Sequence, residues 1–305
     1  MNMTKTIDTS TSVSFALVAK VKDYFQLMKF TLSFTVVFSC VICYLMAPKV
    51  VAYNWGMIVL LFVAGLLITG SANAINQAVE KDTDALMKRT LKRPVASGRM
   101  RAEEAYIFAF ISGVIGVAMM WYFFNLSSAL LSAFSLFLYA FIYTPLKKVN
   151  SIAVLIGGFP GALPCLIGWV AGQDAFTAGG WVLFAIQFLW QFPHFWAIAW
   201  VAHNDYSKAG FKLLPNEKGP TKYTALQTIM YSVLMIPVGL LPAYLNMSGQ
   251  VSMWILLACN LFMVFQSVRL YREMTVKAAR RVMFSSYIYL PIVLFALLAD
   301  KIPGA

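Results

Sequence analysis

The chain has 305 residues, of which 60% are hydrophobic and only 12% are charged. Soluble domains carry about 25% charged residues, so this composition excludes a soluble globular protein and indicates a membrane protein. The formal net charge of +12 would suit a nucleic-acid-binding protein. The positions of the basic residues argue against that class, because they follow the pattern of a membrane topology signal.

The chain begins with a polar segment, residues 1–22, which is rich in serine and threonine and lacks the cleavage pattern of a signal peptide. We interpret it as a cytoplasmic tail that is disordered or lies on the membrane surface, and we expect residues 23–305 to form a single transmembrane domain. Apolar segments long enough to cross a bilayer occur at about 24–46, 54–78, 104–124, 127–145, 151–171, 178–201, 224–245, 251–270 and 283–300. The predicted fold class is all-α, a polytopic bundle of about nine transmembrane helices.

The basic residues predict the orientation of the bundle. Of the 24 lysines and arginines, 22 fall in the tail, at the start of the first span or in every second loop, and only Lys49 and Lys301 fall on the other side. Positive residues mark the cytoplasmic side. We therefore expect the N-terminus in the cytoplasm and the C-terminus outside.

An acidic motif follows the second predicted span. Asn76, Glu80 and Asp84 are spaced i, i+4, i+8, so a continuous helix would place their side chains on one stripe. Oxygen ligands that converge in this way suit Mg²⁺. The alternative is an acidic helix end that Lys81 and Lys88 neutralise.

Basic residues lie next to this motif and at the cytoplasmic end of the fourth span. Lys88, Arg89 and Arg93 follow the acids directly, and arginine forks match a diphosphate group, although a basic loop is also an ordinary topology signal. Tyr143 and Lys147 are ordinary membrane-interface residues. Because they are predicted on the same side of the membrane, they could also reach the same phosphate site.

Both histidines of the chain lie in or just after the sixth span. His194 follows Pro193 in a segment rich in tryptophan and phenylalanine, near Gln191, and His203 precedes Asp205 by two residues. Such an aromatic wall suits a flat aromatic ligand, whereas a membrane histidine is also often a hydrogen-bonding residue between helices. Asp205 offers a further carboxylate for a metal or a basic group.

These motifs resemble a known family. The motif of residues 76–84, the basic run that ends at Arg93-Pro94, and Tyr143-x-x-x-Lys147 resemble the motifs of the intramembrane aromatic prenyltransferases, the UbiA superfamily. The resemblance covers about residues 25–300, so residues 23–305 are expected to be one prenyltransferase domain. The chain departs from the common pattern at Glu80, where aspartate is usual.

A second resemblance is narrower. The segment Trp190-Gln-Phe-Pro-His-Phe-Trp196, with Asp205-Tyr206 and Leu214-Pro215, resembles the protohaem IX farnesyltransferases, a branch of that superfamily. The second acidic motif of other members is reduced here, because Ala209 stands four residues after Asp205.

The resemblance implies a reaction and its participants. A farnesyl group would pass from farnesyl diphosphate to the 2-vinyl group of haem B, giving haem O and diphosphate, with Mg²⁺ as cofactor and haem B as substrate. It implies a bacterial inner-membrane enzyme with its active site near the cytoplasmic face, and haem A synthase or terminal oxidase assembly proteins as partners.

The resemblance also implies roles for residues. Asn76, Glu80 and Asp84 would bind the metal. The diphosphate would be neutralised or hydrogen-bonded by a basic and phenolic set, namely Lys88, Arg89, Arg93, Tyr143 and Lys147. Asp205 would support the site from the opposite loop, and His194 or His203 would contact haem.

Two other functions stay open at this point. A related prenyltransferase would act on a quinone precursor or a chlorophyll-like ring, and the histidine-bearing aromatic segment argues against it. A transporter would line an ion path with intramembrane acids, but here the acids lie near one surface, in a basic loop.

Overall fold

The computed structural model describes residues 9–216 and 219–303, with side chains from residue 17 onward. The described chain is helical throughout its spans and contains no β-strand, only an isolated bridge between Ser248 and Lys301. The all-α class predicted from the sequence is therefore confirmed for the described residues.

The helices follow one another with short connections. The first half contains α1 (Thr9–Leu27), α2 (Phe30–Met46), α3 (Trp55–Val79), α4 (Lys81–Leu86), α5 (Ala102–Phe123), α6 (Leu126–Phe137), the π-helix η1 (Leu138–Tyr143) and α7 (Thr144–Leu146). The second half contains α8 (Ile152–Gln173), α9 (Ala178–Val201), α10 (His203–Lys208), α11 (Lys222–Tyr244), α12 (Gln250–Glu273) and α13 (Val276–Ala299).

Eight of the described helical spans are long and apolar enough to cross a membrane, and the number is nine if the pair α1–α2 counts as one span. The helices α6, η1 and α7 together make one of them, Leu126–Leu146. This agrees with the nine spans predicted from hydrophobicity. The chain is a multi-pass membrane protein.

The first span differs from its prediction because it is broken. α1 and α2 meet at an angle of 50°, and Lys29 at the break has left-handed backbone angles (φ 48°, ψ 55°). Of the expected tail, residues 1–8 lie outside the described residues. Residues 9–22 belong to the helix α1, and the cytoplasmic tail that lies on the membrane surface stays a prediction.

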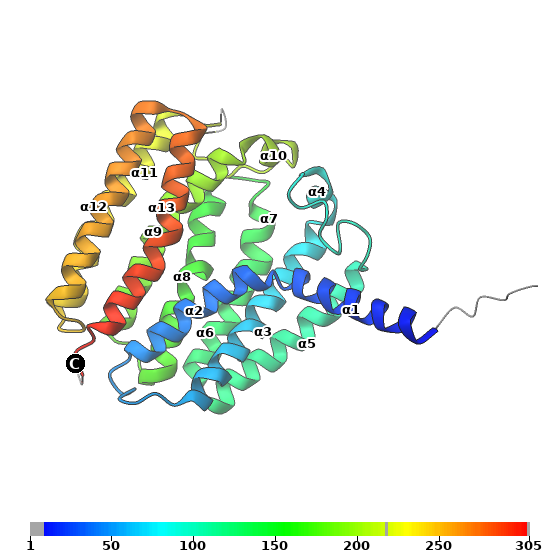
Figure 1. Ribbon diagram of the computed structural model, residues 1–305, viewed down its shortest axis with the longest axis horizontal. Helices are drawn as coiled ribbons and strands as arrows, with labels where there is room; N and C mark the ends of the chain where they lie inside the picture. Colours follow the sequence, from blue (N-terminus) through cyan, green and yellow to red (C-terminus); the bar gives the residue numbers. More distant parts are fainter. Residues whose placement is uncertain (1–8, 217–218, 304–305) are drawn as a thin grey trace, which may run out of the picture.

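Two central helices form the inside of the bundle (Figure 1). In the most apolar 18-residue stretch of each helix, 72% of the residues of α8 and 61% of those of α9 are buried. Both fractions are higher than in any other described span. α2, α3, α5 and α6 lie on one side of this centre, and α11, α12 and α13 lie on the other. The circle of helices closes where α13 packs against α2.

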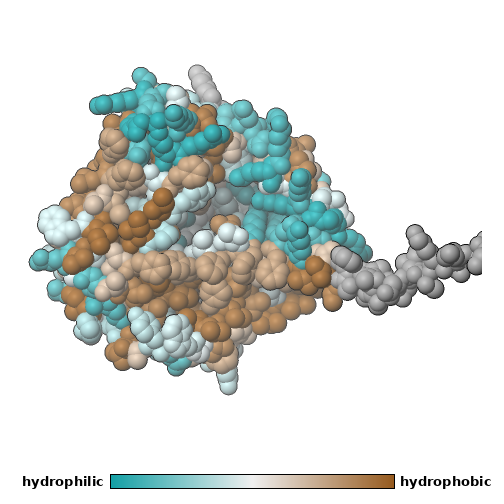
Figure 2. Space-filling view, in the orientation of Figure 1, coloured by the Kyte–Doolittle hydropathy of each residue, from teal (hydrophilic) through white to brown (hydrophobic). Residues whose placement is uncertain are grey.

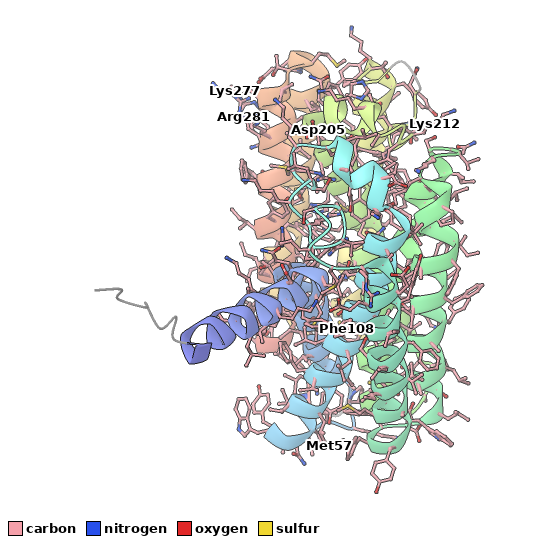
Figure 3. All side chains as sticks on the ribbon, turned by 90° about the vertical axis from the view of Figure 1, so that its right-hand side faces the viewer. Met57, Phe108, Asp205, Lys212, Lys277 and Arg281 are labelled. Carbon is pink, nitrogen blue, oxygen red and sulfur yellow. The ribbon has the colours of Figure 1, made fainter. Side chains whose placement is uncertain are left out.

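Charged side chains gather at one end of the bundle. In Figure 3, Asp205, Lys212, Lys277 and Arg281 lie at one end and Met57 lies at the other. The short helices α4 and α10 lie at the charged end (Figure 1). α4 follows α3 and α10 follows α9. The acidic motif and the segment after the histidine-bearing helix therefore lie at the same end of the molecule.

Candidate active site

The acidic motif lies at the end of α3, and its three side chains are buried. The exposed fractions of Asn76, Glu80 and Asp84 are 1%, 4% and 0%. The continuous helix predicted for this motif is wrong, because α3 ends at Val79 and Glu80 caps it before α4 begins. The backbone carbonyls of Asn76 and Glu80 still accept the i+4 hydrogen bonds of Glu80 and Asp84, so the side chains remain close to one stripe.

Each of the two carboxylates has its own cation. Arg93 donates from Nη1 to both carboxylate oxygens of Asp84, at 2.8 and 2.7 Å. Lys147 Nζ lies 2.5 Å from Glu80 Oε1. A buried carboxylate is costly unless it is paired, so these ion pairs explain how two acids are tolerated at the end of a membrane helix.

A third basic group comes from the break in the first span. Lys29 Nζ donates to Asn76 Oδ1 at 2.8 Å, and it lies within electrostatic range of Glu80, Asp84, Arg93 and Lys147. The left-handed backbone of Lys29 turns its side chain into this cluster. Sequence reasoning counted Lys29 only as a topology signal, and no local pattern distinguished it from the other lysines of the tail.

The π-helix η1 brings two further residues to the cluster. Pro145 has no N–H to donate, and the helix widens just before it, as often happens at functional sites. Thr144 accepts a hydrogen bond of 3.3 Å from Asn76 Nδ2. Tyr143 lies within electrostatic range of Glu80, and Lys147 Nζ lies 4.9 Å from the centre of the Tyr143 ring.

The loop after α9 completes the charged end of the site. Arg89 stacks on the ring of Tyr206, 4.5 Å from its centre, and donates a hydrogen bond of 2.5 Å to the phenol oxygen. The backbone N–H of Lys212 donates to the carbonyl of Lys147 at 2.8 Å, and Lys147 Nζ lies 5.2 Å from the centre of the Phe211 ring. The segments around α4, α7 and α10 thus form one continuous wall.

An aromatic wall made by α9 and α13 borders this cluster. His194 stacks on Trp190, with ring centres 4.7 Å apart, and lies against Tyr287 of α13, with ring centres 5.1 Å apart. Tyr287 lies in turn within electrostatic range of Arg89 and Tyr206. The face of the molecule is hollowed between the hydrophilic side chains over α4 and the hydrophobic ones over α13 (Figure 2).

Three of the residues predicted for the site lie apart from the buried cluster. The Lys88 side chain is exposed, and among the described residues neither it nor the half-buried Asp205 side chain forms a hydrogen bond or an ion pair. His203 lies at the start of α10, 3.4 Å from the hydroxyl of Ser207, in a small pocket of about 320 Å³. Tyr206, the neighbour of Asp205, is the α10 residue that contacts the cluster.

The donor set suits a divalent cation that is completed by a ligand. Among the described residues, no group of three or more histidine, cysteine or acidic side chains could hold a metal by itself. Mg²⁺ commonly binds one or two carboxylates and takes its other oxygens from phosphate and water. Glu80 and Asp84, with the Asn76 amide beside them, fit that requirement.

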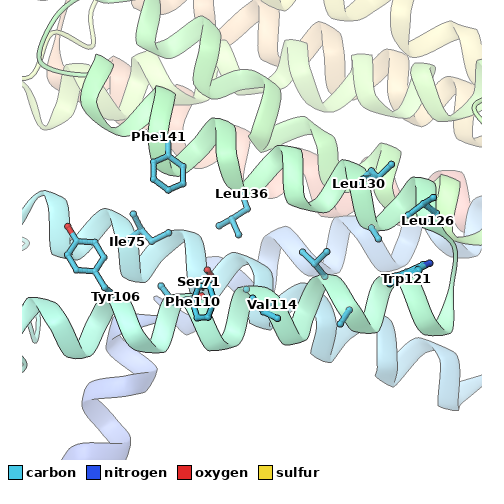
Figure 4. A pocket seen from close by; sticks show the side chains of 15 residues that line it. Ser71, Ile75, Tyr106, Phe110, Val114, Trp121, Leu126, Leu130, Leu136 and Phe141 are labelled. Atoms are coloured by element: carbon cyan, nitrogen blue, oxygen red, sulfur yellow. Dashed lines mark hydrogen bonds between the residues drawn. The ribbon is translucent and has the colours of Figure 1, made fainter.

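A wide apolar groove lies elsewhere in the described part of the molecule. It has a volume of about 710 Å³ and lies between α5 on one side and α6 and η1 on the other (Figure 4). Side chains such as Phe110, Val114, Leu130 and Phe141 line it, and it contains no carboxylate, histidine, lysine or arginine. Without such groups it offers no acid–base or metal chemistry, so the charged cluster is the candidate active site.

Known proteins share both the sequence pattern and the fold. The model of the UbiA prenyltransferase family matches residues 36–289. A protein of Cytophaga hutchinsonii named protoheme IX farnesyltransferase is 46% identical over 286 residues, which cover 94% of this chain and 100% of that protein.

Two solved structures have a similar fold at low identity. A structure of digeranylgeranylglyceryl phosphate synthase aligns with a TM-score of 0.77 at 21% identity, over 92% of this chain and 98% of that one. A UbiA homologue from Archaeoglobus fulgidus, bound to GPP and Mg²⁺, aligns with a TM-score of 0.69 at 16% identity, over 91% of this chain and 99% of that one. These two likenesses concern the fold alone, whereas the family match covers most of the chain, and the chain therefore belongs to the UbiA prenyltransferase family.

Proposed function

We propose that the chain transfers a farnesyl group from farnesyl diphosphate to the 2-vinyl group of haem B, which yields haem O and diphosphate. The observation that carries this proposal is the position of the paired carboxylates beside the histidine-bearing aromatic wall. One part suits a metal-bound diphosphate and the other suits a flat aromatic acceptor. The relative at 46% identity is named for this activity.

The buried cluster would bind the diphosphate. Glu80 and Asp84, with Asn76, would hold Mg²⁺, as the magnesium in the related Archaeoglobus structure supports. A bound Mg²⁺ would supply Lewis-acid stabilisation of the departing phosphate oxygens. Arg93 and Lys147, released from the two carboxylates, would then pair with phosphate oxygens.

The other basic and phenolic groups extend this binding surface. Arg89, which stacks on Tyr206, would offer its remaining guanidinium donors to the diphosphate. Lys29 and Tyr143 would donate from the side of α2 and η1. Such donors, held in place before reaction, stabilise the charge that develops on the leaving group. The exposed Lys88 would attract the anionic substrate from the surface.

The reaction itself balances without a redox partner. The bond between C1 of the farnesyl group and the diphosphate oxygen breaks, and diphosphate leaves with the electron pair. The vinyl π electrons of haem B form the new carbon–carbon bond to C1. Water adds to the resulting cation and loses a proton, which leaves a hydroxyl group on the product. The aromatic wall would limit earlier attack of water on the allylic cation.

The proposal includes a place in the cell. The charged end of the bundle, which carries the active site, faces the cytoplasm of a bacterial inner membrane, because basic residues mark the cytoplasmic side. The N-terminus then lies inside and the C-terminus outside. Enzymes that oxidise the product further, such as a haem A synthase, and terminal oxidase assembly proteins are the partners we propose.

The experiment that tests this function is farnesyl transfer by the purified full chain. Haem extracted after incubation with farnesyl diphosphate and haem B is analysed by mass spectrometry for a mass gain of one hydroxyl and one farnesyl group. The matched control is Arg281→Gln, because Arg281 pairs with Glu273 at the same end of the bundle but away from the cluster. Prenylation of a quinone precursor in place of haem B would contradict the proposal.

A further inference from the structure

Ser286 on α13 contacts two aromatic residues of α9. Its backbone carbonyl accepts a hydrogen bond of 2.9 Å from Trp190 Nε1. Its hydroxyl oxygen lies 2.8 Å from Nδ1 of His194. One buried serine therefore holds both rings of the α9 wall.

The direction of the bond to histidine follows from a third contact. The Ser286 hydroxyl donates to the carbonyl of Met283 at 2.6 Å. A hydroxyl group has one proton and two acceptor lone pairs, and here the proton is already used. Ser286 Oγ can therefore only accept from His194, so Nδ1 of His194 carries the hydrogen.

The other ring nitrogen of His194 is left as a free acceptor. In a neutral imidazole with hydrogen on Nδ1, Nε2 has an unprotonated lone pair. Nε2 makes no hydrogen bond within the described part of the chain, and it is not among the fully buried side-chain atoms that lack a partner there. His194 is 8% exposed, and no group of the described chain uses the lone pair of its Nε2.

The orientation of the ring is also fixed. His194 stacks on Trp190 at an interplanar angle of 18°, and Trp190 itself is held by Ser286. Tyr287 covers the edge at 73°. Histidines that bind metals have this arrangement, in which the N–H of one nitrogen is bonded and the other nitrogen is free.

His203 has no comparable support. Its ring lies 3.5 and 3.4 Å from the exposed Ser207 hydroxyl through Nδ1 and Nε2, so neither nitrogen is singled out. It also lies on α10 and not on the α9–α13 wall, whose Tyr287 lies within electrostatic range of Arg89. The structure thus distinguishes the two histidines that the sequence left equivalent.

We propose, on the basis of the function proposed above, that Nε2 of His194 ligates the iron of the acceptor haem and that Ser286 is the positioning residue that fixes the required tautomer. Iron ligation holds the tetrapyrrole beside the diphosphate cluster. It also makes the site selective for an iron porphyrin over the metal-free ring.

The test is a titration of the purified full chain with ferric haem B, followed by absorption and electron paramagnetic resonance spectra. The wild-type protein is expected to give a histidine-ligated signature that His194→Ala loses and that added imidazole restores. His203→Ala is the matched comparison and is expected to keep the signature. Ser286→Ala is expected to weaken haem affinity by about 10- to 100-fold, and Ser286→Thr, which retains the hydroxyl, is expected to restore it.

The outcomes separate this inference from the proposed function. A histidine signature that persists in His194→Ala, or that disappears in His203→Ala alone, overturns the inference, even if the wild-type protein farnesylates haem B. If Ser286→Ala and Ser286→Thr behave alike, the positioning role of Ser286 is wrong. If the wild-type protein binds haem B through His194 but forms no farnesylated product, the inference holds and the proposed reaction fails.

Discussion

Glu80 and Lys147 form an ion pair of 2.5 Å between Oε1 and Nζ, and their side chains are only 4% and 9% exposed. Two buried charges of opposite sign lose much of their hydration, and the pair is tolerated only while both partners are present. The pair also joins the end of α3 to the end of α7, so it connects the acidic motif to the residues that follow the π-helix.

A double-mutant cycle on this pair separates its structural role from its chemical role. We expect Lys147→Met or Glu80→Gln alone to lower the free energy of unfolding by about 3–5 kcal/mol, because each leaves a buried group without its partner. The double variant is expected to recover part of that stability but no farnesyl transfer. Thermal unfolding in detergent and product formation are the measurements, and full activity of the double variant would contradict the proposed roles.

Arg93 offers a test of geometry at constant charge. Its guanidinium bonds both oxygens of Asp84 through one nitrogen, Nη1. The planar guanidinium carries further donors that would form a fork with diphosphate, whereas a lysine ammonium is a point charge. We expect Arg93→Lys to lower kcat/KM by about 10-fold or more, which corresponds to roughly 1.4 kcal/mol. Arg281→Lys, at an exposed pair with Glu273, is the control and is expected to be near wild type. Equal activities of the two variants would argue against a forked contact with diphosphate.

Tyr206 is expected to act on Arg89 through two separable contacts. Tyr206→Phe removes the hydrogen bond to Arg89 and keeps the stacked ring, whereas Tyr206→Ala removes both. A cation–π contact at a partly exposed site contributes about 0.5–1 kcal/mol. We therefore expect KM for farnesyl diphosphate to rise modestly in the phenylalanine variant and more in the alanine variant, as measured by initial rates. A larger effect of phenylalanine than of alanine would contradict this order.

The spans and the charged end of the molecule could be predicted from sequence, because hydrophobic length and the distribution of lysine and arginine are local properties. The acidic motif was also visible, since Asn76, Glu80 and Asp84 are close in the chain. The break after Val79 was not predicted, because no proline or glycine marks it.

Other members of the site could not be predicted, because tertiary contacts define them. Ser286 and Tyr287 are ordinary residues of an apolar helix until α13 packs on α9, and the contact between Ser286 and His194 spans 92 positions. Lys29 enters the cluster only because the chain takes left-handed angles at that position. The role of Asp205 stays a prediction, and it is the neighbouring Tyr206 that contacts Arg89 in the structure.

Removal of divalent metal is expected to abolish farnesyl transfer while haem B remains bound. Glu80 and Asp84 lie in the charged cluster, whereas the α9–α13 wall contains no carboxylate contact to His194 within the described residues. Treatment with EDTA followed by addition of Mg²⁺ is therefore expected to remove and then restore product formation. The haem absorption spectrum is expected to stay constant throughout. A loss of haem on EDTA treatment would show that the two parts of the site are not independent.

Lys301 offers a test of how the opposite end of the bundle is held. Its ammonium donates to three backbone carbonyls near the end of α2, those of Leu45, Ala47 and Val50, at 2.7, 2.8 and 2.9 Å. These carbonyls have few other donors at a helix end, and burial lowers the pKa of Lys301. Lys301→Met removes all three bonds at once and is expected to lower the free energy of unfolding by about 1–3 kcal/mol.

The matched control for that change is Lys49→Met, because Lys49 is the other basic residue on this side of the bundle and its side chain is exposed. We expect the thermal unfolding midpoint to fall in Lys301→Met and to stay near wild type in Lys49→Met. Farnesyl transfer per folded molecule is expected to change little in either, because Lys301 lies at the end of α2 opposite to Lys29. Because α2 packs against α13, a selective loss of activity in Lys301→Met without a loss of stability would instead show that the junction of these two helices controls access to the site.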